Sequence, residues 1–226
     1  MDVILANLPY MMRGLELTIV LSIVSLAGSF AAGTFLALLR MSPWWWLRWP
    51  AIVYIDVVRM IPLIMVIFWV FFLIPIVTGH PVTPIVAALT ALIGFNSSYM
   101  AEVIRAGIQT VPTGLVEAAR SSGLSHLQAT ARIVLPIALK NMLPAIVSRF
   151  IALFMGTSLA YIIGATEFFR AANDINNRVF RPYEIYTFVA IVYFVFCYAL
   201  SLIGRALERR LSRGQRHISG QSMTSA

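Results

Sequence analysis

The sequence predicts an all-α integral membrane protein with about five transmembrane helices. Its 226 residues are 60% hydrophobic and only 12% charged, and the mean hydropathy of +0.85 lies well above that of soluble globular proteins. Long apolar segments recur along the chain and exceed the roughly 20 residues that a helix needs to cross the hydrocarbon core. A single cysteine, Cys197, excludes an intrachain disulfide and any multi-cysteine metal site.

The first two expected spans, residues 15–39 and 52–77, flank an aromatic elbow. The elbow, residues 40–50, holds four tryptophans and two arginines, side chains that favour the headgroup layer. In the second span Asp56 and Arg59 are three residues apart, so we expect them to share a helix face and pair. Further along, a proline at position 62 is expected to kink or open the helix.

The third and fourth expected spans, residues 84–108 and 133–163, are predicted to line a polar path. Buried polar groups are costly in lipid, so their faces should meet other helices or a water-filled cavity. Pro136, Pro144 and Gly156 interrupt the fourth span, as in a helix beside a cavity. For Arg59 an equally good alternative is packing against Asp56 or Glu102. The candidate path residues are Arg59, Asn96, Ser97, Ser98, Glu102, Arg149, Thr157 and Ser158.

The rest of the chain completes a single domain. Residues 164–182 are expected to form a polar loop with a short helix, and residues 185–207 the fifth span. We therefore expect residues 1–210 to form one transmembrane domain that includes a polar loop at 111–136. The basic tail, residues 211–226, is expected to be disordered and cytoplasmic.

The polar loop at 111–136 is predicted to form two short helices separated by a turn. Pro112 suits a first helical turn, where its missing N–H is not needed. Gly123 suits the left-handed position that ends a helix. Ser125 and Gln128 fit the capping box S-x-x-Q, which begins the second helix.

A motif in this loop resembles a known family. The pattern E-A-A-x3-G-x9-I-x-L-P, present without a mismatch, is typical of the permease subunits of bacterial ATP-binding-cassette importers. The resemblance implies a cytoplasmic coupling helix, between the third and fourth spans, that docks in a groove of an ATPase subunit. An ordinary alanine-rich loop is the alternative. The matching residues are Glu117, Ala118, Ala119, Gly123, Ile133, Leu135 and Pro136.

The resemblance extends over residues 15–209. The strings at 57–75, 98–114 and 157–173 look like the polar amino-acid branch of these permeases, and IPLIMVIFW with EFFRAA is closest to glutamate/aspartate permeases. In that setting Glu117 could pair with a basic residue of the ATPase, while Ala118 and Ala119 would allow close approach. One departure is Met155 and Gly156, where many members carry a polar or acidic residue, so cavity chemistry cannot simply be copied.

The basic residues predict the orientation. With the C-terminus inside, eleven of the 17 lysines and arginines lie in the cytoplasm and four outside. This places the N-terminus outside a bacterial inner membrane and the 111–136 loop in the cytoplasm. Arg170, Arg178 and Arg181 in the outer loop are interpreted as solvated, or alternatively as facing a solute-binding protein or an anionic substrate.

The motifs also limit the function. Neither G-x-x-x-x-G-K-[ST] nor H-E-x-x-H occurs, so we expect no enzyme activity and no cofactor or metal in this chain, with ATP and Mg held by a partner ATPase. The resemblance implies import of a polar amino acid, best glutamate or aspartate and otherwise another polar or basic one, by alternating access. A secondary carrier or a membrane scaffold is the rival class, although no internal repeat supports a carrier.

The same resemblance defines the expected partners. These are a dimer of ATPase subunits, a second permease subunit that is either identical or a paralogue, and a periplasmic or surface solute-binding protein. Membrane lipid surrounds the chain, and nucleic acid is not expected, because the basic residues are scattered between apolar segments.

Overall fold

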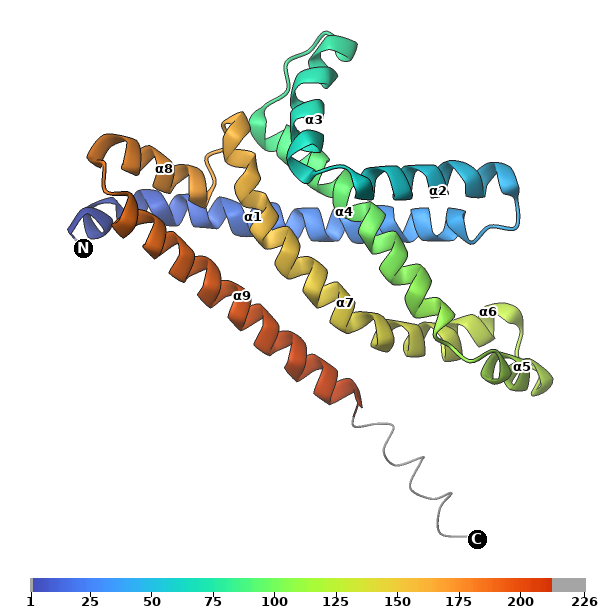
Figure 1. The fold of residues 1–226 in the computed structure, drawn as a ribbon. Helices are drawn as coiled ribbons and strands as arrows, with labels where there is room; N and C mark the ends of the chain where they lie inside the picture. The colour runs from blue at the N-terminus through green and yellow to red at the C-terminus, as the bar shows by residue number, and fades with distance from the viewer. Residues whose placement is uncertain (1, 213–226) are drawn as a thin grey trace.

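The structure is a computed structural model that describes residues 2–212 (Figure 1). Within this range the chain forms helices joined by short connections and contains no strand. The all-α prediction is therefore confirmed. The helices are α1 (Asp2–Arg40), α2 (Trp45–Met60), α3 (Leu63–Thr78), α4 (Pro84–Gln109), α5 (Thr113–Ser121), α6 (His126–Ala129), a π-helical turn (Thr130–Val134), α7 (Leu135–Gly156), a 3-10 segment (Thr157–Ile163), α8 (Phe168–Val179) and α9 (Pro182–Ser212).

Five segments are suited to cross a membrane. Four are long apolar helices: α1, α4, the continuous segment His126–Ile163, and α9. The fifth consists of α2 and α3, which meet at an angle of 110°. Arg40 Nη1 lies 2.9 Å from Glu102 Oε1, so α1 and α4 end on the same side. Since α4 itself crosses, it begins on the opposite side, and the chain from the end of α1 to the start of α4 must also cross. The helices α2 and α3 therefore form one broken span, with the break at Pro62 as the sequence predicted.

The packing of α1 against α4 depends on small residues. A Cβ on Gly33 would lie only 2.7 Å from Met100 Cβ, and one on Gly28 only 2.7 Å from Ile93 Cδ1. Such close backbone approach is the usual way in which helices associate in lipid. By contrast, Phe194 on α9 is 67% exposed and suits contact with acyl chains or another subunit.

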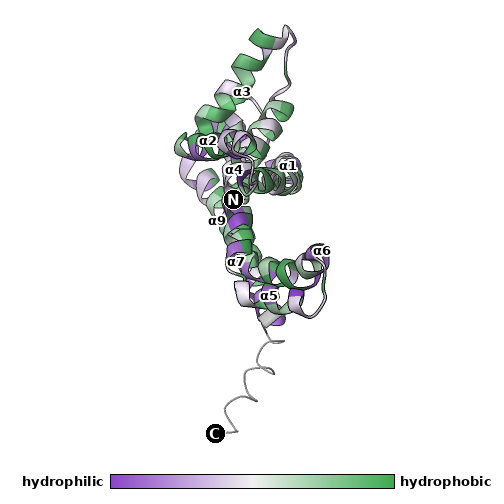
Figure 2. Ribbon diagram, turned by 90° about the vertical axis from the view of Figure 1, so that its right-hand side faces the viewer, coloured by the Kyte–Doolittle hydropathy of each residue, from purple (hydrophilic) through white to green (hydrophobic). Residues whose placement is uncertain are grey.

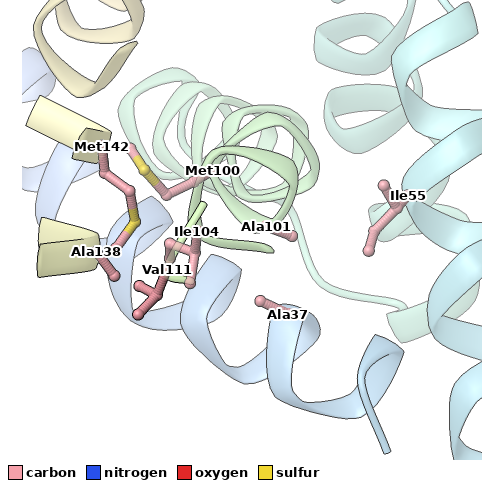
Figure 3. Close-up of a cluster of buried hydrophobic side chains, with 8 residues drawn as sticks. All are labelled: Ala37, Ile55, Met100, Ala101, Ile104, Val111, Ala138 and Met142. Atoms are coloured by element: carbon pink, nitrogen blue, oxygen red, sulfur yellow. The ribbon is translucent and has the colours of Figure 1, made fainter. Parts of the chain in front are cut away.

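A buried cluster anchors the polar loop to the membrane helices (Figure 3). It brings together side chains from α1, α2, α4 and α7, together with Val111 at the entrance of the loop. Figure 2 shows hydrophilic, purple residues on α5 and α6, whereas α3 is largely green and hydrophobic. The cluster consists of Ala37, Ile55, Met100, Ala101, Ile104, Val111, Ala138 and Met142.

The structure corrects several expected boundaries. The first helix begins at Asp2 rather than near residue 15, because Met11 and Leu15 pack against Phe168 of α8. The aromatic elbow is shorter than expected, since α2 already begins at Trp45. Pro144 lies inside α7 without ending it.

Other expectations concern the charges and the tail. Asp56 does not pair with Arg59: its Oδ1 lies 3.2 Å from Arg40 Nη1. A neighbouring helix thus supplies a better-placed cation than the same helix does. Of the predicted disordered tail, positions 211 and 212 complete α9, and residues 213–226 lie outside the described residues.

Candidate functional site

The loop between α4 and α7 folds as a helix, a sharp turn and a second helix. After α5, the Leu124 N–H donates to Ala119 O at 3.2 Å and the Gly123 N–H to Arg120 O at 3.0 Å. These two bonds form a Schellman motif, which requires a left-handed residue after the helix. Gly123 takes that position with a φ of +88°. Pro112 precedes α5 as its N-cap rather than lying within the first turn.

The restart of the helix follows the predicted capping box. Ser125 Oγ accepts from the Gln128 N–H at 3.3 Å, and Gln128 Oε1 accepts from the Ser125 N–H at 2.9 Å. The reciprocal bonds satisfy two backbone donors that have no partner within the helix. A π-helical turn, Thr130–Val134, then joins α6 to α7. Such turns insert an extra residue into a helix and occur frequently at functional sites.

The motif residues divide into an outer and an inner set. Glu117 and Ala118 are exposed, as are Leu135 and Pro136, whereas Ile133 is half-buried. Ala119 is only 8% exposed and packs toward the protein itself. Of the two alanines, Ala118 alone is therefore available to a partner at close range.

Two exposed leucines add apolar surface that the sequence reading missed. Leu127 on α6 is 83% exposed and Leu115 on α5 is 47% exposed. Together with the exposed Glu117, these leucines give the α5–α6 loop both apolar and acidic surface. The sequence contained one signal for this surface, namely leucines within a loop that is otherwise rich in polar residues. Such a surface is suited to bind a protein groove.

A second cluster of polar side chains lies within the membrane-spanning part. Arg149 Nη2 donates to Asn96 Oδ1 at 3.1 Å, and the guanidinium stacks 3.9 Å from the centre of the Tyr99 ring. Arg149 Nε is buried and has no hydrogen-bond partner among the described residues. Sequence reasoning named Arg149 and Asn96 but missed Tyr99. The role of Tyr99 depends on its contact with Arg149 of another helix, which the sequence alone does not reveal.

Arg59 and Glu102 extend this cluster toward the loop. The Arg59 guanidinium lies 5.2 Å from the Tyr99 ring centre, and its backbone oxygen accepts from the Tyr99 hydroxyl at 3.3 Å. Arg59 Nη1 is 3.9 Å from Glu102 Oε2. The alternative of helix-to-helix packing against Glu102 is therefore also present in the structure.

The break between α2 and α3 lies next to the same cluster. Ile61 and Pro62 are both extended, with ψ of 137°. A Cβ on Gly156 would lie 3.1 Å from Leu63 Cδ2, so α3 begins close to the end of α7. Discontinuous helices whose ends project into the membrane midplane form substrate sites in many transporters.

The remaining predicted path residues do not join this cluster through side-chain bonds. Their hydroxyl groups donate to backbone oxygens of their own helical segment, each at 2.7 Å. Ser98 and Thr157 are fully buried. The four residues are Ser97, Ser98, Thr157 and Ser158.

A buried carboxylate holds the opposite end of the molecule together. Glu167 caps α8 by accepting from the Phe169 N–H at 2.9 Å and the Arg170 N–H at 2.7 Å. Its carboxylate also lies 3.5 Å from Thr18 Oγ1 of α1 and 3.4 Å from the Tyr193 hydroxyl of α9. Burial raises the pKa of the Glu167 carboxyl to about 7, against the opposing effect of the two backbone N–H groups.

The sequence analysis placed Glu167 in the polar loop at 164–182 and did not predict its burial. An acid immediately before a pair of phenylalanines was a signal for a helix cap, but not for burial. The structure describes this residue as fully buried, so its role is structural in the resting fold.

Comparisons with known proteins agree with this architecture. The chain is 35% identical over 214 residues to the glutamate/aspartate import permease protein GltK of Escherichia coli O6:H1, which covers 92% of this chain and 96% of the relative. It is 37% identical over 209 residues to the probable glutamine ABC transporter permease protein GlnP of Bacillus subtilis strain 168, covering 90% and 94%. A crystal structure of an amino acid ABC transporter with histidines matches with a TM-score of 0.85 at 32% identity, covering 92% of this chain and 96% of that one.

The family model supports the same assignment. It is described as a binding-protein-dependent transport system inner membrane component, and it matches residues 8–213. That range includes most of α1, the broken span, the loop with its motif and the later crossing segments. The chain therefore belongs to the family of inner-membrane components of binding-protein-dependent transport systems.

Proposed function

We propose that the chain is the permease subunit of an ATP-driven importer for a polar amino acid, with glutamate or aspartate as the substrate. As a transport-system membrane component it is not an enzyme. The proposal draws on the relatives named for glutamate/aspartate and glutamine. An external binding protein would deliver the amino acid, and separate ATPase subunits would hold ATP and Mg.

The observation that carries the substrate proposal is the uncompensated charge of Arg149. Among the described residues it has no acidic partner, and its polar contacts are the Asn96 amide and the Tyr99 ring. A cation in a low-dielectric site is unfavourable unless an anion neutralises it. The buried Nε adds a donor without an acceptor. A substrate carboxylate would satisfy both requirements.

A second cation favours an acidic side chain over a neutral one. Arg59 shares the Tyr99 ring with Arg149 and interacts with Glu102 only at 3.9 Å. The α-carboxylate common to all amino acids would bind one guanidinium, and the side-chain carboxylate of glutamate or aspartate the other. The N-terminus of α3, next to the break, adds a favourable dipole.

Transport would follow alternating access. In this mechanism each ATPase grips an α5–α6 loop through Glu117, Ala118 and the exposed leucines, and ATPase closure moves the membrane helices as rigid bodies. The positive-inside rule supports a cytoplasmic loop, an outer N-terminus and an inner C-terminus. One chain encloses little space, so a second permease subunit, identical or paralogous, would complete the pore.

Competitive uptake in cells that carry the whole transport system tests the substrate. We expect unlabelled aspartate to compete strongly with radiolabelled glutamate, and glutamine and arginine to compete weakly. Arg149→Gln should weaken apparent glutamate affinity about 100-fold, because a desolvated charge pair is lost. Arg13→Gln, at an exposed position on α1, is the matched control. A preference for arginine would refute the acidic substrate, and uptake that survives removal of the ATPase would indicate a secondary carrier.

A further inference from the structure

A cavity lined by arginines lies on the same side of the molecule as the α5–α6 loop. It has a volume of about 350 Å³, and its lining residues come from the end of α1, the beginning of α2 and the end of α4. Gln109, one of its lining residues, ends α4 just before α5 begins at Thr113. The lining residues are Arg40, Met41, Arg48, Ile52, Arg105 and Gln109.

The charges around this cavity do not balance. Arg40 Nη1 lies 2.9 Å from Glu102 Oε1 and Arg105 Nη2 lies 2.9 Å from Glu102 Oε2, so one carboxylate serves two guanidinium groups. Within residues 2–212, the only other acid that forms an ion pair with these arginines is Asp56, which also binds Arg40. Arg48 has no ion pair or hydrogen bond among the described residues. The cavity therefore keeps a net positive charge and one free guanidinium.

The surroundings place the cavity at the level of lipid headgroups. Trp44, Trp45, Trp46 and Trp49 are close in sequence to the lining residue Arg48, and each of them is between 56% and 73% exposed. The rings of Trp44 and Trp46 stack with centres 5.7 Å apart. Exposed indole rings concentrate in the interfacial layer between acyl chains and water. An anion that reaches the cavity from the side is therefore a membrane component.

We propose that this cavity binds the phosphodiester headgroup of an anionic phospholipid such as phosphatidylglycerol. The planar fork of a guanidinium matches two oxygens of a phosphate, and basic pockets between membrane helices are suited to acidic headgroups. Free inorganic phosphate shares this chemistry, but it lacks the acyl chains that the tryptophan-rich surface would contact. A bound lipid would lie beside the loop that the proposed function assigns to the ATPase, although the site does not depend on that function.

Tryptophan fluorescence provides a direct test, because four of the five tryptophans lie within four positions of Arg48, which lines the cavity. The full-length chain is reconstituted in phosphatidylcholine vesicles with increasing fractions of brominated phosphatidylglycerol, whose bromines quench nearby indoles. Brominated phosphatidylcholine measures quenching by the bulk bilayer. The ratio of the two gives the preference of the site for the anionic headgroup. Circular dichroism of each variant checks that the helices are intact.

Arg48→Gln is the informative variant, because its side chain is exposed and supports no described contact. We expect it to reduce the preference for phosphatidylglycerol about five-fold, the effect of one guanidinium near a charged surface. Arg209→Gln removes an equal charge from the exposed end of α9 and should leave the preference unchanged. Equal preference in the wild type and Arg48→Gln would overturn the proposal. Millimolar inorganic phosphate that relieves the quenching as fully as unbrominated phosphatidylglycerol would overturn the lipid assignment.

Discussion

Two helix starts at opposite ends of the molecule use the same local device in opposite environments (Figure 1). At α6, the Ser125 hydroxyl accepts from the Gln128 N–H, and both residues are exposed. At α8, the Glu167 carboxylate accepts from the N–H groups of Phe169 and Arg170, and it is fully buried. Each cap satisfies backbone donors that the helix leaves free.

The environment decides what each cap does for the protein. Water can replace an exposed cap, so the α5–α6 junction can change its contacts at low cost when a partner binds. Nothing can replace Glu167, because Thr18 of α1 and Tyr193 of α9 surround it and exclude solvent. The comparison teaches that the cap at the loop end can change its hydrogen-bond partners at low cost, as the proposed function requires, whereas the α8 end holds three helices together.

The largest expected effect is on transport, from changes in the α5–α6 turn. Gly123→Asp places a side chain at φ +88°, which L residues rarely adopt, so the turn must reorient and move α5. We expect uptake to fall to background while the protein still inserts. Glu117→Lys should have the same effect by inverting the exposed charge. Uptake assays with membrane-fraction immunoblots measure both outcomes.

Gly79→Asp is the matched control for the turn. Gly79 also has a positive φ, +71°, and nothing lies within 4 Å of a Cβ at either glycine. The backbone strain is therefore similar, but Gly79 follows α3, away from the α5–α6 loop. Normal uptake with Gly123→Asp, or equal loss with both variants, would contradict the special role of the loop.

The next largest effect is on stability, from the buried cap. Glu167→Ala leaves two N–H groups without acceptors in a dry site, and we expect it to destabilise the fold by about 2 kcal/mol. Thermal unfolding in detergent measures the change. Glu16→Ala removes an exposed acid from α1, two residues before Thr18, and should change stability by less than about 0.5 kcal/mol. Similar melting temperatures for the two variants would contradict the comparison.

The pH dependence of stability sharpens the role of Glu167. Its folded pKa of about 7 lies above the ordinary value of 4.5, so the native state binds the proton more tightly than the unfolded state. Stability is therefore highest below about pH 4.5 and falls as the pH rises to about 7. Between pH 6 and pH 8 the loss should be on the order of 1 kcal/mol. Glu167→Gln should remove this component, and an unchanged pH profile would contradict it.

Sequence reasoning predicted the loop end well because its determinants are local. Gly123, Ser125 and Gln128 lie within six positions, and each favours one backbone conformation or one hydrogen bond with a near neighbour. The break at Pro62 followed from the same kind of rule. The order of the five crossing segments followed from hydropathy alone.

Contacts between distant helices were beyond such reasoning. Asp56 and Arg59 have the spacing of an ion pair within one helix, but Asp56 forms its ion pair with Arg40 of another helix. The Tyr99 ring became important only where Arg149 stacks on it. Hydropathy assigned Glu167 to a polar loop, since burial depends on how α1, α8 and α9 meet. These choices depend on tertiary packing rather than on spacing.

The smallest expected effect is on the exposed cap. Ser125→Ala removes the acceptor for the Gln128 N–H, but water can bind that donor, so global stability should fall by only about 0.5 kcal/mol. The loss should appear locally instead, as faster amide hydrogen exchange in α6, His126–Ala129. Ser125→Asp retains an acceptor at the cap and should restore slow exchange. If Ser125→Ala lowered the melting temperature as much as Glu167→Ala, the loop would be part of the cooperative core. In that case the proposed ATPase could not move the loop without unfolding the chain.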